Sequence, residues 1–342
     1  MYVELLYYTP NYPQLVERVT RECYNSHDRA TDKSFKFLKG VLSKGHLSVL
    51  GVGNIVFRII PDVVYYWSKY HVARTLMKMK EINNYIRWTE YDDGWVVSMN
   101  MLTLTDVLRE VDNCITRDIK EIVMDIPSLR WFLTYEDIDL GENIYYEKHQ
   151  SELYHPTLLS EDYTFLREVG LSKKELDIHA TFTVEFTTDT DVATQTWRHS
   201  DMTGGSQMSF RYVDRVNAKI RELVGVNEND ILRYLNEKNV SYNEETIKHS
   251  LKELDEVRNL LKTNYQLILT QFSDILPKGR AKEIARTVAP KFETRVIQCR
   301  PLKQWNHLFD LRCTVHAQKE ARADMEPIKE IFDSITLGNT QR

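Results

Sequence analysis

The chain has 342 residues, of which 42% are hydrophobic and 28% charged, and its formal net charge is −5. This composition excludes wholesale disorder, and the length allows one large domain or two ordinary ones with a sizeable core. The acidic balance argues against a nucleic-acid binder, because neither a global positive field nor a basic–aromatic stripe is present to attract a polyanion.

The four cysteines are scattered singly along the chain and form no C-x-x-C pair, so the sequence predicts neither a metal site nor a redox motif. We expect reduced thiols, as in a cytosolic protein. The N-terminus lacks the pattern of a signal peptide, and the longest apolar stretch, 47–60, is too short to cross a bilayer. We therefore expect a cytoplasmic protein without a membrane partner.

The first 60 residues predict a helix over 31–44, ended by Gly45, and then a strand in which Ile55, Phe57 and Ile59 alternate with their neighbours. Residues 61–177 are rich in Tyr, Trp and Asp and carry no chemical motif. Within them we expect helices over 68–85 and 104–118 and a short strand over 95–99.

A clear pattern returns at residue 180. Phe182, Val184 and Phe186 predict a strand, and 187–190 offer N-caps for a helix from about Asp191. Further helices are predicted over 212–223, 227–238, 243–272 and 281–289, and from Pro301 onward. The helix at 243–272 carries an apolar stripe from Ile247 to Ile268. Because strands and helices do not alternate regularly and no G-x-G-x-x-G follows a strand, we predict an α+β fold and no Rossmann domain.

The most chemically informative segment begins at the end of the helix near Asp191. Gln195, Arg198 and His199 have i, i+3, i+4 spacing and would share one helical face. Gly204-Gly205 follows, and then Ser206, Ser209 and Arg211. Glycines let backbone amides approach an anion, and hydroxyl and guanidinium groups add donors. The pattern indicates a phosphate site, although a solvated, salt-bridged helix end explains the residues equally well.

A second group of cations gathers toward the C-terminus. It comprises Arg286, Arg295 and Arg300, together with Arg312 and His316, which we expect at i, i+4 on the final helix. Ordinary surface charge explains each of these residues taken singly. Together they could supply the several cations that phosphorylated ligands need.

Four separated elements resemble the flavin-dependent thymidylate synthases, the ThyX family. The family's R-H-R and E/Q-x-S-x-R-Y pattern resembles Arg198-His199-Ser200 followed by 207–212, with Gln195 three residues upstream. The other three elements are G-H-x-S at 45–48, A-R-x-x-x-P at 285–290, and L-R…H-A-Q-x-E at 311–320. They occur in the family's order. Ser200 replaces the second Arg of R-H-R, and Gly51 replaces a Glu that usually follows G-H-x-S.

The resemblance implies a ThyX-like fold, with a mixed or antiparallel sheet packed against long helices. Residues 1–60 and 179–342 would form the core, and 61–178 would be a large, mainly helical insertion of unknown role. A divergent, long member of this kind would not be unusual in a phage, and its cytoplasm would then be the host's. The family builds shared active sites in a homotetramer, which we expect here too.

The resemblance also implies an activity: C5 methylation of dUMP to dTMP, with FAD as the cofactor and methylenetetrahydrofolate and NADPH as co-substrates. By position, Arg312 is the catalytic residue, which meets the uracil edge. The implied dUMP contacts are Gln195, Arg198, Gln207, Ser209, Arg211, Arg286 and Arg312. The implied FAD contacts are His46, Ser48, Arg198, His199, Gln207, Arg300 and His307.

Two other functions fit the same sequence. The first is a flavin-dependent hydroxymethylase acting on dUMP or dCMP on the same scaffold, which a hydroxymethyl product would reveal. The second is a non-catalytic nucleotide-binding protein, which would be colourless and would bind no flavin.

Overall fold

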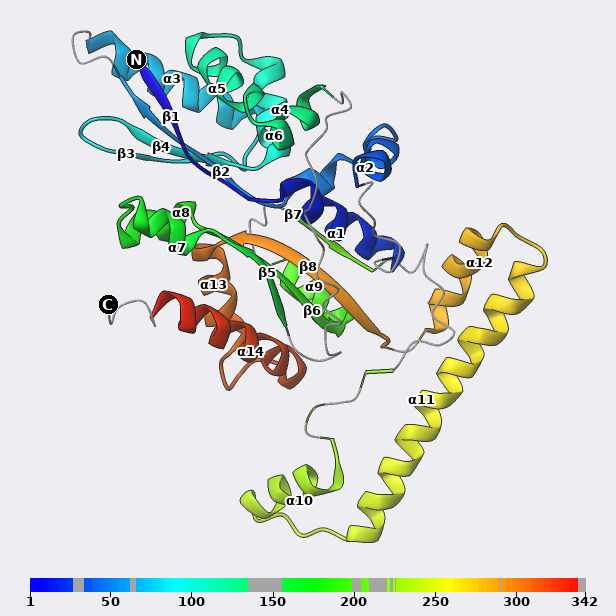
Figure 1. Ribbon diagram of the computed structural model, residues 1–342. Helices are drawn as coiled ribbons and strands as arrows, with labels where there is room; N and C mark the ends of the chain where they lie inside the picture. Colours follow the sequence, from blue (N-terminus) through cyan, green and yellow to red (C-terminus); the bar gives the residue numbers. More distant parts are fainter. Residues whose placement is uncertain are drawn as a thin grey trace.

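A computed structural model describes residues 1–26, 34–61, 66–134, 156–198, 204–208, 220–221, 224, 226–289 and 291–337. Within these residues the chain forms 14 α-helices and two four-stranded antiparallel sheets (Figure 1). The predicted α+β class is confirmed. No helix in these ranges is long and apolar enough to cross a membrane.

The first sheet has the strand order β1-β2-β4-β3. Its strands are β1 (Tyr2–Tyr8), β2 (Ile55–Ile60), β3 (Arg87–Glu90) and β4 (Trp95–Met99). The two strands predicted near 55–59 and 95–99 are confirmed, and they pair with each other from Ile55↔Met99 to Ile59↔Trp95. The region expected as an insertion therefore contributes two strands to the same sheet as the N-terminus.

Helices from 66–134 cover one face of the first sheet (Figure 1). They are α3 (Tyr66–Ile82), α4 (Met101–Glu110), α5 (Cys114–Met124) and α6 (Pro127–Thr134). The single helix predicted over 104–118 is wrong, because the chain breaks after Glu110. Asn113 and Thr116 then form a capping box that starts a new helix.

The second sheet has the order β5-β6-β8-β7. Its strands are β5 (Thr157–Glu161), β6 (Thr181–Asp189), β7 (Gly204–Gln207) and β8 (Glu293–Pro301). β6 and β8 pair along their whole length, from Thr181↔Pro301 to Asp189↔Glu293. On one face Phe182 stacks on Phe332 with ring centroids 4.2 Å apart, and the Trp305 indole donates to the Phe182 carbonyl at 3.0 Å.

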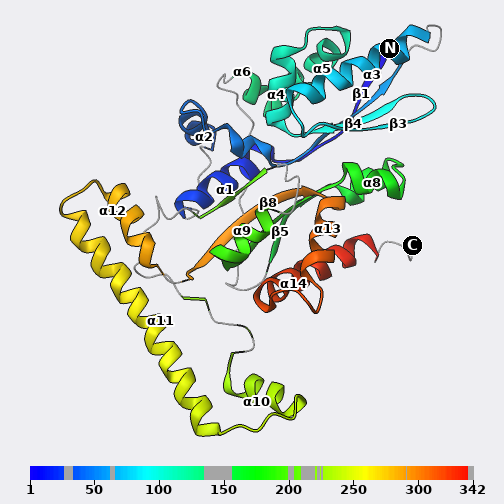
Figure 2. The ribbon, with the colours of Figure 1, turned by 180° about the vertical axis from the view of Figure 1, so that it is seen from behind.

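The other helices of the body lie around the two sheets, and Figure 2 shows α1 and α9 on opposite faces of the second sheet. They are α1 (Tyr12–Tyr24), α2 (Ser34–Leu42), η2 (Leu47–Gly51), α7 (Tyr163–Glu168), α8 (Lys173–His179), α9 (Thr190–Arg198), α13 (Leu302–Arg312) and α14 (Lys319–Thr336). The predicted stop of α2 is confirmed, since Gly45 has φ +81°.

An arm of helices projects from the body beside β8 (Figure 1). It consists of α10 (Glu228–Glu237), α11 (Glu244–Ser273), α12 (Lys278–Ala285) and the 3-10 turn η3 (Arg286–Val288). The helices predicted over 227–238 and 243–272 are confirmed, with Asn227 and Asn243 as N-caps. Nearly all of the helix predicted over 212–223 lies outside the described residues.

The two sheets share their hydrophobic packing. Leu6 and Val56 of the first sheet belong to the core beneath the second, while Ile297 and Cys299 of β8 belong to the core of the first. The division into a core at 1–60 and 179–342 with an insertion between them stays a prediction.

Candidate functional site

The strand β8 lies in the middle of the second sheet, next to several of the segments that carry predicted site residues. It pairs with β7 on one side and β6 on the other, α9 packs against β6 and β8, and η2 packs against β7. The segment at 204–207 therefore lies between two segments far from it in sequence: it contacts η2 directly and is linked to α9 through β8. The contact between η2 and β7 is tight: a Cβ on Gly204 would lie 2.1 Å from the carbonyl carbon of Gly51.

The helix α9 carries two of the predicted residues on its last turn. The Asp189 carboxylate caps its start by accepting from the amides of Asp191 and Val192 at 2.8 and 2.9 Å. At the other end Arg198 is exposed, and Gln195 Nε2 donates to Gln318 Oε1 at 2.8 Å. This hydrogen bond joins the end of α9 to the turn before α14, where the 311–320 element lies. His199 and Ser200 lie outside the described residues.

Arg300, expected to contact FAD, is fully buried beneath α9. Its Nη2 donates to the Thr196 carbonyl and to Gln298 Oε1, both at 2.7 Å, and Gln298 Nε2 donates to Thr196 Oγ1 at 2.8 Å. Burial lowers the pKa of Arg300 to about 9. Nη1 is buried without a hydrogen-bond partner. In this conformation Arg300 anchors the turn of α9 that precedes Arg198.

The final cationic pair is arranged differently from the prediction. α13 ends at Arg312, and His316 lies in the turn before α14, so the expected i, i+4 placement on one helix is wrong. The physical reason is that Cys313 leaves the helical conformation as the C-cap. Arg312 is partly buried, and its Nε has no hydrogen-bond partner. His307 is exposed on the middle of α13.

The remaining predicted residues fall into two groups. His46 and Ser48 are exposed at η2, and Gln207 is partly buried on β7, opposite Val296 of β8. Arg286 begins η3, whose Val288 packs against the cluster that contains Phe292, next to the start of β8. The prediction for Ser209 and Arg211 lies outside the described residues.

Two buried ion pairs were not predicted from the sequence. Glu185, 3% exposed, accepts a bidentate pair from Arg18 of α1 at 2.6–3.0 Å, and Arg295 lies 3.8 Å away. Asp324 accepts from Arg221 at 2.6 Å and from Thr188 at 2.7 Å. Sequence spacing gives no signal for pairs separated by more than 100 residues. Arg295 is thereby tied to carboxylates, which leaves Arg198 as the more accessible cation.

The side chains displayed around β7, η2 and the end of α9 are imidazole, hydroxyl, amide and guanidinium groups. Such donors suit a phosphate-bearing ligand, and a flavin dinucleotide carries a diphosphate. Buried Arg300 fits only as support from below.

A family model described as "Thymidylate synthase complementing protein" matches residues 174–336. The match begins in α8 and covers three of the four strands of the second sheet, all but β5, together with the arm and the last two helices, so it contains α9, β7, β8 and Arg312. It supports the resemblance to the ThyX family and indicates a thymidylate-synthase type of enzyme. No curated protein matched the chain.

Proposed function

We propose that this chain is a divergent, long ThyX-type enzyme that uses FAD, methylenetetrahydrofolate and NADPH to methylate dUMP at C5. The observation that carries the proposal is the arrangement of three elements along β7 and β8: β7 (204–207) and α9, which ends at 195–198, contact β8, and η2, which follows 45–46, contacts β7. Two of the three lie inside the matched region. A fourth, at 311–320, is tied to α9 through the Gln195–Gln318 hydrogen bond.

In this proposal His46, Ser48, Arg198 and Gln207 hold FAD, together with His199 and with support from Arg300. Bound FAD would carry the hydride that completes the methyl group. Arg312 would meet the uracil edge, where its unpartnered Nε offers a permanently charged donor to an oxygen that gains negative charge. Gln195, Gln207, Ser209, Arg211 and Arg286 would hold the nucleotide.

A flavin spectrum tests the cofactor. We expect the purified chain to bind FAD and its absorbance to change on addition of dUMP. Arg198→Ala should weaken FAD binding at least about tenfold, the effect of one lost charge-assisted hydrogen bond. Arg117→Ala is the control, because Arg117 is also exposed but lies on α5. A chain that binds no flavin, or an R198A variant that binds it like R117A, would overturn the proposal.

Product analysis tests the reaction. Incubation with dUMP, methylenetetrahydrofolate and NADPH should give dTMP, and Arg312→Ala should reduce kcat about 100-fold or more, as expected for loss of a donor to developing charge. A hydroxymethylated nucleotide in place of dTMP would replace this reaction with the hydroxymethylase on the same scaffold.

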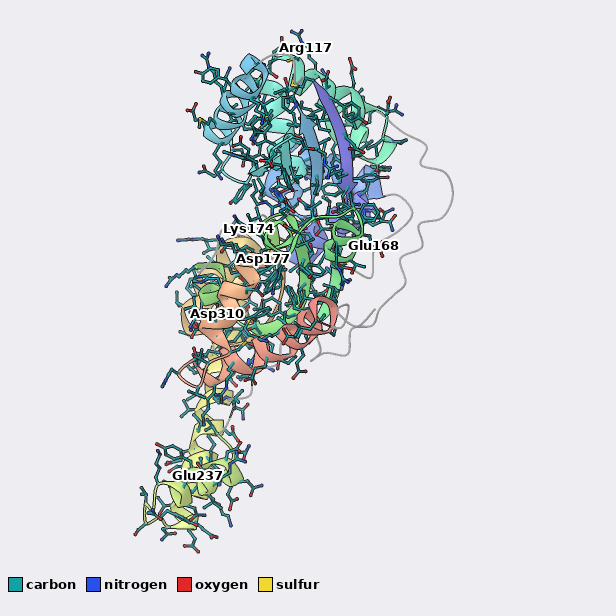
Figure 3. All side chains as sticks on the ribbon, turned by 90° about the vertical axis from the view of Figure 1, so that its left-hand side faces the viewer. Arg117, Glu168, Lys174, Asp177, Glu237 and Asp310 are labelled. Carbon is teal, nitrogen blue, oxygen red and sulfur yellow. The ribbon has the colours of Figure 1, made fainter. Side chains whose placement is uncertain are left out.

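We also propose that the arm packs against further copies of the chain in a homotetramer with shared active sites. α10 buries none of its residues and α11 buries only Tyr265 and Leu269. Figure 3 shows Glu237 of α10 at the opposite end of the molecule from Arg117. Large exposed apolar side chains line the arm: Tyr234, Val240, Tyr242, Val257, Leu260, Leu261, Leu267 and Ile275. An apolar stripe of this size is typical of a protein interface.

Light scattering during size exclusion tests the assembly. The wild-type chain should elute at four chain masses, and the double variant Val257→Glu, Leu260→Glu should shift to smaller species. Lys252→Glu is the control, because its side chain is 76% exposed on the same helix and already charged. A monomeric wild type would contradict the homotetramer.

A further inference from the structure

A cavity of about 360 Å³ lies where the N-terminal half of the chain meets the second sheet. It opens between the end of α3, the strand β3, the end of α8 and the start of α13. Figure 3 shows the side of the molecule on which this junction lies, with Lys174 and Asp177 of α8 labelled beside it. The lining contains none of the residues assigned above to FAD or dUMP. Its residues are Lys80, Asn84, Tyr85, Ile86, Arg87, Trp88, Ile178, Pro301, Lys303 and Gln304.

The charge of this lining is positive, in contrast to the net charge of the chain. Lys80, Arg87 and Lys303 contribute three cations, and no Asp or Glu is among the lining residues. A low-dielectric wall bearing one sign of charge concentrates ions of the opposite sign. The cavity therefore favours an anion.

Arg87 is fixed in place by the structure around it. Its Nη1 donates to the Ile178 carbonyl and its Nη2 to Asn54 Oδ1, both at 3.0 Å. Burial lowers the pKa of Arg87 to about 10, so the guanidinium stays charged at neutral pH. Its Nε is buried without a hydrogen-bond partner. Its two hydrogen-bond partners are a carbonyl and an amide oxygen, which carry no net charge. The buried Asp162 carboxyl, which bonds the same Asn54 side chain, partly offsets the lowering of the Arg87 pKa.

The first turn of α13 adds backbone donors to the same wall. The amide of Leu302 is occupied by the Ala180 carbonyl at 2.9 Å. The amides of Lys303 and Gln304, at the second and third positions of an 11-residue helix, have no acceptor within the helix. The helix dipole is positive at this end, so the amides and the Lys303 ammonium favour a phosphate or carboxylate group.

Aromatic and amide side chains complete the wall. Tyr85 is 37% exposed, and Trp88 is partly buried. Asn84 and Gln304 supply amide groups that can both donate and accept. Aromatic faces with amides recognise planar polar rings, whereas a site for an inorganic ion needs neither. The volume is at the small end of the range for ligand pockets, about 300–1,000 Å³, and suits a single small ligand.

We propose that this cavity binds a mononucleotide at a site separate from the dUMP and FAD sites proposed above. The phosphate lies at the start of α13 beside Lys303. Lys80, whose ammonium donates to the Asn84 and Ile86 carbonyls, adds positive charge to the wall, and the base lies against Tyr85 and Trp88. Since the lining comes from both halves of the chain, bound nucleotide would hold the α3–β3 segment against α8 and α13.

Titration calorimetry with AMP, GMP, CMP and dTMP, and with inorganic phosphate as a probe without a ring, tests this proposal. At least one nucleotide should bind the wild-type chain more tightly than phosphate does. Lys303→Glu should lower the affinity for that nucleotide at least about tenfold, because it reverses the charge beside the phosphate. Lys120→Glu is the matched control, because Lys120 is an exposed lysine on α5. The dissociation constant of its nucleotide complex should stay within about twofold of the wild-type value. Tyr85→Ala should lower the affinity for the nucleotide several-fold and leave the affinity for inorganic phosphate unchanged.

Three results would overturn the proposal: no nucleotide binds, phosphate binds as tightly as every nucleotide, or K303E and K120E bind alike. Lys303 is exposed, so K303E should keep the wild-type melting temperature; if it does not, Lys303→Ala replaces it in the same comparison. The FAD spectrum is an independent readout. A colourless chain with K303E-sensitive nucleotide binding would remove the enzyme proposal and keep this one.

Discussion

Asp162 and His179 are buried titratable residues that meet around Asn54, at the junction of the two halves. Asn54 Nδ2 donates to Asp162 Oδ2 at 2.7 Å and to the His179 carbonyl at 2.8 Å. The His179 ring nitrogens lie 2.8 and 2.9 Å from the hydroxyls of Ser98 and Thr89. Burial raises the pKa of Asp162 to about 7 and lowers the pKa of His179 to about 3. Both groups are therefore neutral in the folded chain at mildly acidic pH.

These two pKa shifts have opposite effects on stability between pH 4 and 6.5. Unfolding releases a proton from Asp162, whose pKa falls from about 7 to its ordinary value, so its stabilising contribution declines as pH rises. Unfolding takes up a proton at His179, whose pKa rises from about 3, so its contribution is lost as pH falls. We predict that Asp162→Asn removes the first effect. The unfolding free energy should then rise with pH more steeply than in wild type, by about 1.4 kcal/mol per pH unit.

Urea unfolding at several pH values in this window measures the slope for both proteins. Other titrating groups are common to both, so only the difference between the slopes matters. His179→Gln is the complementary variant, and its slope should be lower than that of wild type. Equal slopes for wild type and D162N would show that Asp162 is already ionised in the folded chain.

For Arg300, the sequence predicted a role but not the burial of the side chain. The resemblance implied that it contacts FAD, which stays a prediction, and the structure places its side chain beneath α9. The sequence could not reveal that it is fully buried, because its partner Thr196 lies 104 residues away. We predict that Arg300→Lys costs about 1–3 kcal/mol of stability, since an ammonium cannot replace the fork that holds Thr196 and Gln298. Chemical denaturation checks this; a cost no larger than that of Arg117→Lys on the surface would contradict it.

At the scale of elements, the approach of β7 to η2 depends on a glycine. A Cβ on Gly204 would meet backbone atoms of Gly51 and Val52 at 2.1–2.5 Å, and backbone cannot move aside as a side chain can. We predict that Gly204→Ala separates η2 from β7, costs about 1–3 kcal/mol or more, and weakens FAD binding in parallel. Denaturation and the flavin spectrum measure the two effects.

Gly40→Ala is the matched control for this change. Gly40 lies within α2, and a Cβ there would meet nothing within 4 Å. Alanine should stabilise the chain at this position by about 0.5–1 kcal/mol, because it is the better helix former. If G204A is as stable as G40A and binds FAD normally, the packing of β7 on η2 does not matter for the site.

Elements with strong local signals were predicted well. α10 and α11 begin at Asn caps, and β4 is bounded as expected at 95–99, because caps and alternation are local properties. The prediction failed where a helix ended without an obvious breaker, as at Glu110 and at Arg312. Val111 and Cys313 break no helix by propensity, so the residues at the two ends gave no stop signal. The one local sign near the first end was Asn113, which with Thr116 caps the next helix.

At the scale of the whole molecule, the sequence predicted an insertion of unknown role, at 61–178, between two parts of a core, and this division stays a prediction. The structure shows sheets that pack on each other: Leu6 and Val56 contribute to the core under the second sheet, and Ile297 and Cys299 to the core of the first. Strand order and inter-sheet packing depend on contacts far apart in sequence, which a single sequence does not reveal.

This shared packing has a consequence for the region that matches the family. We predict that a fragment of residues 156–342, which contains the whole match, does not fold cooperatively alone, even though it keeps all four strands of the second sheet. Removing residues 1–155 would expose the β8 face that bears Ile297 and Cys299 and would leave Glu185 without Arg18, which now binds it in a bidentate pair. Near-UV circular dichroism and thermal unfolding should show no sharp transition in the fragment and a cooperative one in the full chain. A fragment that melts as sharply as the full chain would mean that the second sheet is an independent domain, and that the first half of the chain serves the site without being needed to build it.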